Sequence, residues 1–271
     1  MGSRKALFFD VDGTLFSEAW QRVPESAIKA VAEARRQGHL TFVNSGRVYC
    51  LLDPIRQSID MDGYLCGCGT YIVLEGKEVY ARSIPHGQGL KIKQLLKDCK
   101  VEAILEARDS CHFKRDTSWM PKLEKLRGNI LKDGKVSPHP IEEDGYVFDK
   151  FCCYTDEGSD IERFLKDLEA DFEVIDRGDD FWECVPRGHS KATAIGMVLD
   201  HYGLSLEDAY VFGDSTNDLS MFTYAKNTVL MGKHDKDLEP YAAYTTRTVE
   251  EDGIAYALKQ LGIIDKVFYK E

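Results

Sequence analysis

Short apolar runs alternate with amphipathic segments over the first third of the chain. Three such runs predict buried strands: Ala6–Phe9, Leu40–Val43 and Tyr64–Cys66. Between the first two, Pro24–Gln37 has apolar residues at helical spacing, and Gly38 suits the C-terminal cap. A second helix is expected around Tyr49–Ile59, where Pro54 predicts a kink or a late start. This strand–helix–strand order favours a parallel sheet with right-handed crossovers.

The pattern changes after the third strand. Two short strand-like segments flank Glu75–Lys77 and predict a hairpin, and Ser83–Gly89 is expected to be a linker. From Leu90 to about Glu183 the pattern predicts helix, strand, helix, strand, helix, strand and strand. We therefore expect an α+β unit with an antiparallel sheet, inserted over residues 83–185.

The first pattern resumes after a second linker at Pro186–His189. Ser190 is a good N-cap for an amphipathic helix. The remaining elements are expected at Ala209–Phe212 (strand), Asn217–Tyr224 (helix), Asn227–Met231 (strand) and Ile254–Leu261 (helix). The predicted fold class is α/β, with a Rossmann-like parallel-sheet core from residues 1–82 and 186–271 and the inserted α+β domain over 83–185.

Composition limits the kinds of partner. The chain has 271 residues, of which 43% are hydrophobic, and a formal net charge of −11. The acidic balance argues against nucleic acid, and no apolar run is long enough to span a membrane. We expect no secretory signal, because the chain leads straight into its first strand. The eight cysteines form no Cys-x-x-Cys pattern, so reduced thiols in a cytoplasmic protein are expected. Separately, we expect a monomer or a weak homo-oligomer.

Candidate chemistry begins with Asp10-Val11-Asp12-Gly13-Thr14, directly after the first strand. Two carboxylates about 4 Å apart repel by roughly 4 kcal/mol at an effective dielectric near 20. A bound cation, or a proton on one carboxylate, relieves that repulsion. Both conditions suit phosphoryl transfer, in which one aspartate attacks phosphorus and the other supplies a proton to the leaving oxygen. The alternative interpretation is an Asp-rich turn followed by glycine.

Three further signals follow in order. Ser45-Gly46-Arg47 comes after the second strand, Ser190-Lys191 opens a helix, and Gly213-Asp214-Ser215-Thr216-Asn217-Asp218 follows a later strand. The carboxyl ends of parallel strands meet at one edge of a sheet, so these residues can form one pocket. Taken singly, Ser45 could be a turn residue, Lys191 a surface lysine and Asp218 a helix N-cap.

Together, these motifs resemble the haloacid dehalogenase superfamily, and within it the Cof-like phosphatases of sugar-phosphatase type with a large α/β cap. The resemblance covers nearly the whole chain, and the Asp10–Thr14 and Gly213–Asp218 motifs carry most of its specificity. It assigns Asp10 as the nucleophile and Asp12 as the general acid and base, in agreement with the chemistry above. It also implies that the inserted domain is a cap over a haloacid dehalogenase-like core.

The expected cofactor is Mg²⁺, a hard cation that prefers oxygen ligands. Its expected ligands are Asp10, the backbone carbonyl of Asp12, and Asp214, with Asp218 acting through a water. The phosphoryl group is expected to be held by Ser45, Gly46, Lys191 and Asn217. Arg47 is expected to contact the substrate, and the alternative for this residue is a surface ion pair.

Two segments depart from the family pattern. Cof-like proteins usually carry Asn-Gly where this chain has Cys68-Gly69, and Gly-Asn-Ala where it has Gly232-Lys233-His234. Neither change touches the expected nucleophile, metal or phosphate residues. Only the transfer of a substrate preference from the family is affected.

The sequence therefore predicts a magnesium-dependent phosphomonoester hydrolase for a small soluble phosphate, foremost a sugar phosphate, acting through an aspartyl-phosphate. One alternative is a phosphohexomutase of the same superfamily, whose second phosphate would meet Arg108, Lys114 and Arg115. Another is a non-catalytic phospholigand-binding protein. That protein would be expected to lack Asp10, Asp12 or Lys191, and all three are present.

Overall fold

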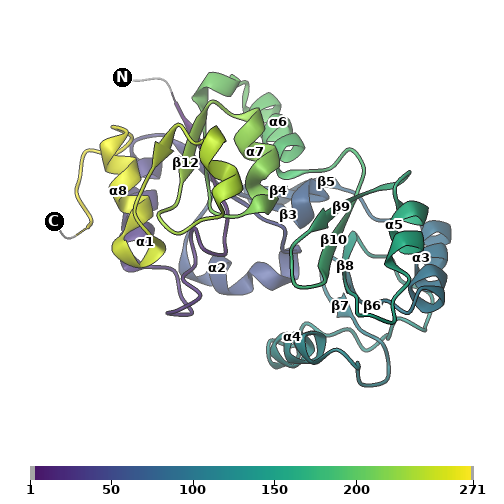
Figure 1. Ribbon diagram of the computed structural model, residues 1–271. Helices are drawn as coiled ribbons and strands as arrows, with labels where there is room; N and C mark the ends of the chain where they lie inside the picture. The colour runs from purple at the N-terminus through teal and green to yellow at the C-terminus, as the bar shows by residue number, and fades with distance from the viewer. Residues whose placement is uncertain (1–3, 270–271) are drawn as a thin grey trace. The chain divides into compact units, whose positions relative to one another are not determined.

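The computed structural model describes residues 4–269 of the chain. The chain divides into two compact units, and each is described by itself. The first comprises Met1–Gly46, Leu52–Val79 and Ser190–Glu271, and the second comprises Arg47–Leu51 and Tyr80–His189. In Figure 1 the first unit carries both purple and green-to-yellow ribbon, because most of the second unit is inserted between its two halves.

An eight-stranded sheet runs through the described part of the first unit in the order β13-β12-β11-β1-β2-β3-β4-β5. Neighbouring strands from β13 to β3 are parallel, and β4 is antiparallel to β3. The strands are β1 Ala6–Phe9, β2 Leu40–Asn44, β3 Gly63–Cys66, β4 Tyr71–Leu74, β5 Lys77–Ala81, β11 Ala209–Gly213, β12 Asn227–Leu230 and β13 Tyr244–Thr245. This arrangement confirms the predicted α/β class. The central strands β1 and β2 are buried throughout, as apolar parallel strands covered on both faces should be.

Four helices of the first unit pack in two pairs. Helix α1 packs against α8, and α6 packs against α7 (Figure 1). The bounds are α1 Glu25–Arg36, α2 Asp53–Ser58, α6 Lys191–Tyr202, α7 Leu219–Tyr224 and α8 Gly253–Gln260. The Ser190 hydroxyl accepts a hydrogen bond from the Thr193 backbone N–H, which fixes the start of α6 at Lys191.

The late start predicted for the helix around Tyr49–Ile59 is confirmed: a 3-10 turn at Tyr49–Leu52 precedes α2, whose first turn holds Pro54. Two other predicted elements differ in detail from the structure. A 3-10 turn at Thr216–Asp218 likewise precedes α7. The predicted C-terminal boundary of the Ser83–Gly89 linker was wrong, because α3 already begins at His86, just after Pro85.

The second unit is built on an antiparallel sheet in the order β7-β6-β8-β10-β9. Its strands are β6 Glu102–Glu106, β7 Cys111–His112, β8 Lys150–Tyr154, β9 Phe172–Asp176 and β10 Phe181–Pro186, and its helices are α3 His86–Asp98, α4 Pro121–Lys132 and α5 Ile161–Leu168. The two-residue strand β7 was not predicted. Side chains alternate along β8: Phe151 and Cys153 join a cluster with α3 and α5, and Cys152 and Tyr154 join one with α4.

Two further findings concern the whole described chain. All eight cysteines are buried, and none of them forms a disulfide. No helix within residues 4–269 is both long and apolar enough to cross a membrane.

Candidate active site

The site begins where β1 and β11 end side by side. These strands pair in parallel, and the backbone N–H of Asp10 donates to the Phe212 carbonyl at 3.0 Å. Asp10 follows β1 directly, and Asp214 follows β11 directly. The parallel register therefore brings two carboxylates together from positions far apart in the sequence.

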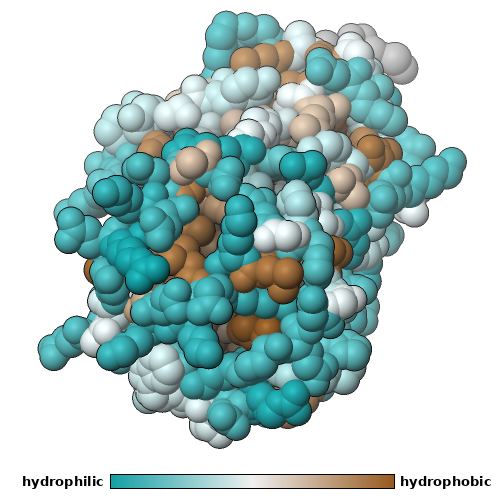
Figure 2. All heavy atoms as spheres, turned by 90° about the vertical axis from the view of Figure 1, so that its right-hand side faces the viewer, coloured by the Kyte–Doolittle hydropathy of each residue, from teal (hydrophilic) through white to brown (hydrophobic). Residues whose placement is uncertain are grey.

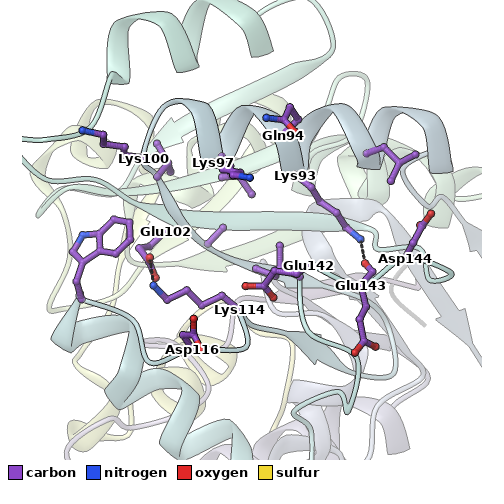
Figure 3. A pocket seen from close by; sticks show the side chains of 16 residues that line it. Lys93, Gln94, Lys97, Lys100, Glu102, Lys114, Asp116, Glu142, Glu143 and Asp144 are labelled. Atoms are coloured by element: carbon purple, nitrogen blue, oxygen red, sulfur yellow. Dashed lines mark hydrogen bonds and ion pairs between the residues drawn. The ribbon is translucent and has the colours of Figure 1, made fainter.

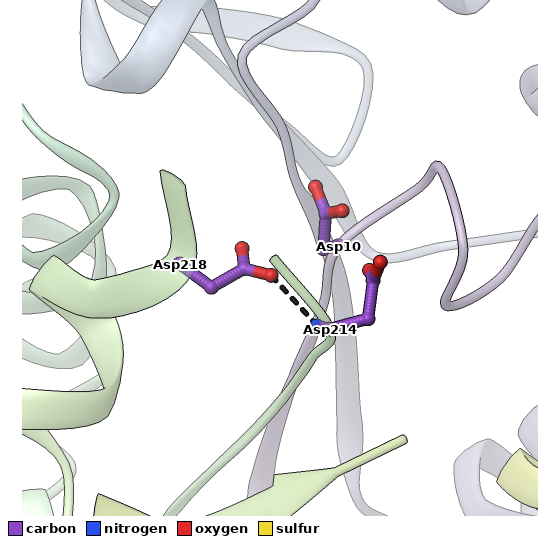
Figure 4. A group of neighbouring side chains, drawn as sticks. All are labelled: Asp10, Asp214 and Asp218. Atoms are coloured by element: carbon purple, nitrogen blue, oxygen red, sulfur yellow. Dashed lines mark hydrogen bonds between the residues drawn. The ribbon is translucent and has the colours of Figure 1, made fainter. Parts of the chain in front are cut away.

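Three aspartates converge at this edge. Carboxylate oxygens of Asp10, Asp214 and Asp218 all lie within 4.8 Å of one another. Figure 4 shows the side chain of Asp218 reaching from the start of α7 toward the other two, which stand beside each other. Asp10 and Asp218 are buried, and Asp214 is partly buried.

Lys191 supplies a positive charge to this group. Its Nζ atom lies 2.6 Å from Oδ1 of Asp10 and 2.5 Å from Oδ1 of Asp218. The lysine is 1% exposed, so it is held almost completely away from water. A buried ammonium bridging two carboxylates satisfies charges that would otherwise be very costly to bury.

Asp218 organises its neighbours. Its Oδ2 accepts hydrogen bonds from the backbone N–H groups of Asp214 at 2.9 Å and Ser215 at 3.2 Å. Its Oδ1 meets Lys191. Both oxygens therefore already have partners, which suits a carboxylate that positions Lys191 and the Asp214 loop.

The loop after β1 fixes Asp214 from the other side. The Thr14 hydroxyl donates to Oδ1 of Asp214 at 2.9 Å. Gly13 has a φ of +79°, and a Cβ atom there would lie only 2.3 Å from Oδ2 of Asp214. This close approach explains why glycine is needed at that position. Thr14 was part of the predicted motif, but no role had been assigned to it.

The end of β2 carries Asn44 and is followed by Ser45, and it contacts the start of α6. The Ser45 N–H donates to the Leu65 carbonyl at 2.9 Å, and the Ser45 carbonyl accepts from Cys68 at 3.1 Å. Asn44 donates from Nδ2 to the Lys191 carbonyl at 3.0 Å. Sequence reasoning did not assign Asn44, although its place at a strand end beside Ser45 was a usable signal.

The other predicted residues differ in their placement. Asp12 and Gly46 are partly buried in the first unit. Asn217 is also partly buried, and its Oδ1 accepts from the Ser215 hydroxyl at 2.8 Å. Arg47 instead groups with the second unit, where its Nη1 donates to the Leu51 carbonyl at 3.3 Å. Its contact with substrate stays a prediction.

Burial and mutual repulsion shift the titration of the acidic group. Burial, followed by the nearby Asp218 and Asp12 charges, raises the pKa of Asp10 to about 7 even though Lys191 opposes the shift. Burial and the charges of Asp10 and Asp218 raise the pKa of Asp214 to about 8. Burial alone would lower the pKa of Lys191, but the Asp10 and Asp218 carboxylates raise it.

The donor set suits a hard divalent cation. The converging ligand atoms are all carboxylate oxygens, with no thiol or imidazole among them. A divalent cation bound to these carboxylates would stabilise their charged forms and so remove the cause of the raised pKa values. The chemistry of the donor set therefore fits a resident metal ion.

Comparison with known proteins identifies the family. The model of haloacid dehalogenase-like hydrolases matches residues 7–258. The chain belongs to this family. Phosphatases of the haloacid dehalogenase-like family generally use a divalent metal, and an acidic group able to hold one is present here.

Relatives and solved structures agree with that assignment. A Bacillus subtilis protein with the provisional name of phosphatase YkrA is 31% identical, covering 96% of this chain and 98% of its own. The 5-amino-6-(5-phospho-D-ribitylamino)uracil phosphatase YcsE of Bacillus subtilis is 25% identical, covering 94% of each chain. The haloacid dehalogenase subclass IIB sugar phosphatase BT4131 superimposes with a TM-score of 0.80 at 27% identity, covering 96% of this chain and 100% of its own. The predicted Cof-like resemblance is confirmed, and these findings support a hydrolase acting on phosphate esters.

Proposed function

We propose that this chain is a Mg²⁺-dependent phosphomonoester hydrolase that forms an aspartyl-phosphate on Asp10. The observation that carries the proposal is the buried 2.6 Å contact between Lys191 Nζ and Asp10 Oδ1, with an Asp214 carboxylate oxygen within 4.8 Å. The ammonium and a cation at these carboxylates would bind the oxygens of a phosphoryl group, which places its phosphorus within reach of the Asp10 carboxylate.

Each catalytic residue has a distinct proposed role. An Asp10 oxygen attacks phosphorus, the bond from phosphorus to the leaving oxygen breaks, and Asp12 gives that oxygen a proton. Asp12 then takes a proton from a water that attacks phosphorus, and the bond to Asp10 breaks to release phosphate. Lys191, Ser45, Gly46 and Asn217 hold the phosphoryl oxygens.

Asp10, Asp214 and the Asp12 carbonyl would hold Mg²⁺, with Asp218 acting through a water. When bound, Mg²⁺ offsets repulsion between the carboxylates and a dianionic phosphate. This assignment agrees with the hydrogen bonds of Asp218, whose carboxylate oxygens already serve Lys191 and two backbone N–H groups.

The proposed substrate is a small phosphorylated metabolite, foremost a sugar phosphate. The names of two similar proteins support it, since one is a 5-amino-6-(5-phospho-D-ribitylamino)uracil phosphatase and the other is a sugar phosphatase. We further propose that residues 1–82 and 186–271 are the catalytic core and that residues 83–185 are a cap. The cap would exclude water and read the leaving group.

The second unit favours hydrolysis over the mutase alternative. A mutase would need free cations for a second phosphate, but each candidate already pairs with a carboxylate. These pairs are Arg108 with Asp149 at 2.9 Å, Lys114 with Glu102 at 2.6 Å and Arg115 with Glu143 at 2.8 Å. A purely binding role is disfavoured because the buried Asp10–Lys191–Asp218 arrangement is intact.

The test is phosphate release from para-nitrophenyl phosphate and from a panel of sugar, nucleotide and vitamin phosphates. Each is run with Mg²⁺, with EDTA and with the Asp10→Asn variant. Asp60→Asn is the matched control, because Asp60 is an exposed acid of the same unit. Release that needs Mg²⁺, survives in the control and is lost in Asp10→Asn supports the proposal. No release from any compound by folded protein with Mg²⁺ contradicts it.

A further inference from the structure

The second unit contains a cavity that the proposed hydrolysis does not use. Its volume is about 660 Å³, which lies within the range of small-molecule pockets. Its apolar lining comes from Leu90, Leu96, Val101, Ala103, Trp119 and Ile141. Figure 2 views the molecule from the right-hand side of Figure 1 and shows hydrophobic hollows surrounded by hydrophilic side chains. Figure 3 shows the cavity at close range.

Glu102 is the most informative residue of this cavity. It is only 4% exposed, and its Oε1 accepts from Lys114 Nζ at 2.6 Å. Its Oε2 is also buried but has no hydrogen-bond partner among the described residues. A buried acceptor left unpaired costs about 1–3 kcal/mol, so such atoms call for an explanation. An N–H donor on a bound ligand would satisfy this oxygen.

The cavity wall also carries charges that the fold leaves available. Lys97 lies on α3 and Lys100 in the turn that follows it, and within residues 4–269 neither ammonium has an ion-pair partner. The same holds for the carboxylate of Asp116, which Figure 3 shows on the opposite wall from α3. By contrast, Lys93 donates to the Glu143 carbonyl at 2.6 Å. Available charges of both signs therefore face one apolar space.

We propose that this cavity binds a small zwitterion with an apolar body, namely an apolar α-amino acid. Its ammonium would donate to Glu102 Oε2, its carboxylate would face Lys97 and Lys100, and its side chain would pack on the apolar lining. Trp119 is 51% exposed and offers an aromatic surface for that side chain.

Charge balance favours a zwitterion over a polyanion such as a nucleotide. The lining holds five carboxylates against four ammonium groups: Glu102, Asp116, Glu142, Glu143 and Asp144 against Lys93, Lys97, Lys100 and Lys114. A multiply charged phosphate would meet more like charge than opposite charge, whereas a ligand with one charge of each sign meets partners for both.

The test is calorimetric titration of the full chain with L-phenylalanine, which is not a phosphate ester and so cannot be hydrolysed as one. Phenethylamine and 3-phenylpropanoate, each lacking one of the two charges, are the comparison ligands. Glu102→Gln keeps the side-chain shape but weakens the acceptor, and Lys97→Ala removes an available ammonium. Lys91→Ala is the matched control, since Lys91 is exposed on α3 but does not line the cavity.

Saturable binding of L-phenylalanine is expected, with each single-charge analogue weaker by tenfold or more. Glu102→Gln and Lys97→Ala should each weaken binding at least tenfold, and Lys91→Ala should leave it unchanged. Absence of saturable binding to the wild type, or binding unchanged by both cavity variants, would overturn the proposal. If Glu102→Gln does not fold, the Lys97→Ala and Lys91→Ala pair together with the analogues decides the question. Phosphate release from para-nitrophenyl phosphate, measured separately, reports on the hydrolytic site alone.

Discussion

Lys191 Nζ lies 2.6 Å from Oδ1 of Asp10, although 181 positions separate the two residues in the sequence. The contact exists because Asp10 directly follows β1, while Asn44 at the end of the neighbouring strand β2 binds the Lys191 carbonyl at the start of α6. Asp218 completes the arrangement on the far side of the ammonium at 2.5 Å. One buried cation thus compensates two buried carboxylates, and its removal should affect both folding and catalysis.

Replacing Lys191 by methionine should destabilise the protein by about 3–5 kcal/mol, since two buried carboxylates would lose their counter-charge. Phosphate release should fall by at least about a hundredfold. Urea unfolding in EDTA measures the first effect. Lys226→Met is the matched control: Lys226 pairs with Glu207 at the surface, where an ion pair contributes at most about 1 kcal/mol. Equal losses of stability in the two variants would contradict this account.

Gly13→Ala should damage the site through the position of Asp214. The new Cβ would lie 2.3 Å from Oδ2 of Asp214, so that carboxylate has to move. A displacement near 1 Å can cost about a hundredfold in kcat/KM. Gly38→Ala is the control, because Gly38 also has a positive φ, +94°, but nothing lies within 4 Å of an added Cβ. That variant should lose about 1–2 kcal/mol of stability and keep its activity.

Metal-free protein should become less stable as the pH rises from about 4 to about 8. The pKa of Asp10 is raised to about 7 and that of Asp214 to about 8, so the folded state keeps protons that the unfolded chain has released. The free energy of unfolding therefore falls with pH over that window. Mg²⁺ would take the place of those protons, so its stabilising effect should grow with pH.

Thermal melts with Mg²⁺ and with EDTA at about pH 6 and pH 8 check this linkage. The increase in Tm caused by Mg²⁺ should be larger at the higher pH. Asp214→Asn should remove most of this difference between the two pH values, because the substitution removes both a carboxyl group with a raised pKa and a proposed Mg²⁺ ligand. An increase that is the same at both pH values would count against metal binding at these carboxylates.

The positions of Asp10 and Asp214 could be predicted because each follows an apolar run that forms a strand of the parallel sheet. Strand order and register then bring the two residues together without help from other signals. Lys191 was placed correctly at a helix start because Ser190 is a strong N-cap. The positions of motifs at the ends of strands and helices can therefore be predicted from the sequence.

Contacts that depend on tertiary packing were not predictable in the same way. Arg47–Leu51 groups with the second unit, where Val48 and Cys50 join its apolar cluster. A segment of five residues is too short to show a periodic hydrophobic pattern, so the sequence could not indicate that it belongs to the second unit. The two backbone hydrogen bonds to Asp218 likewise depend on the conformation of one loop. The strand β7 has only two residues and so leaves no alternating pattern.

The most direct test of the central claim is mass spectrometry of the Asp12→Asn variant after reaction with para-nitrophenyl phosphate and Mg²⁺. The para-nitrophenolate leaving group needs no proton, so Asp10 should still be phosphorylated. Loss of the general base should then slow hydrolysis of the intermediate. The account predicts one added phosphoryl group on the peptide that contains Asp10, and none when Asp10→Asn is also present. Steady phosphate release by the wild type, with no phosphoryl group on that peptide in Asp12→Asn and continued release in Asp10→Asn, would contradict it.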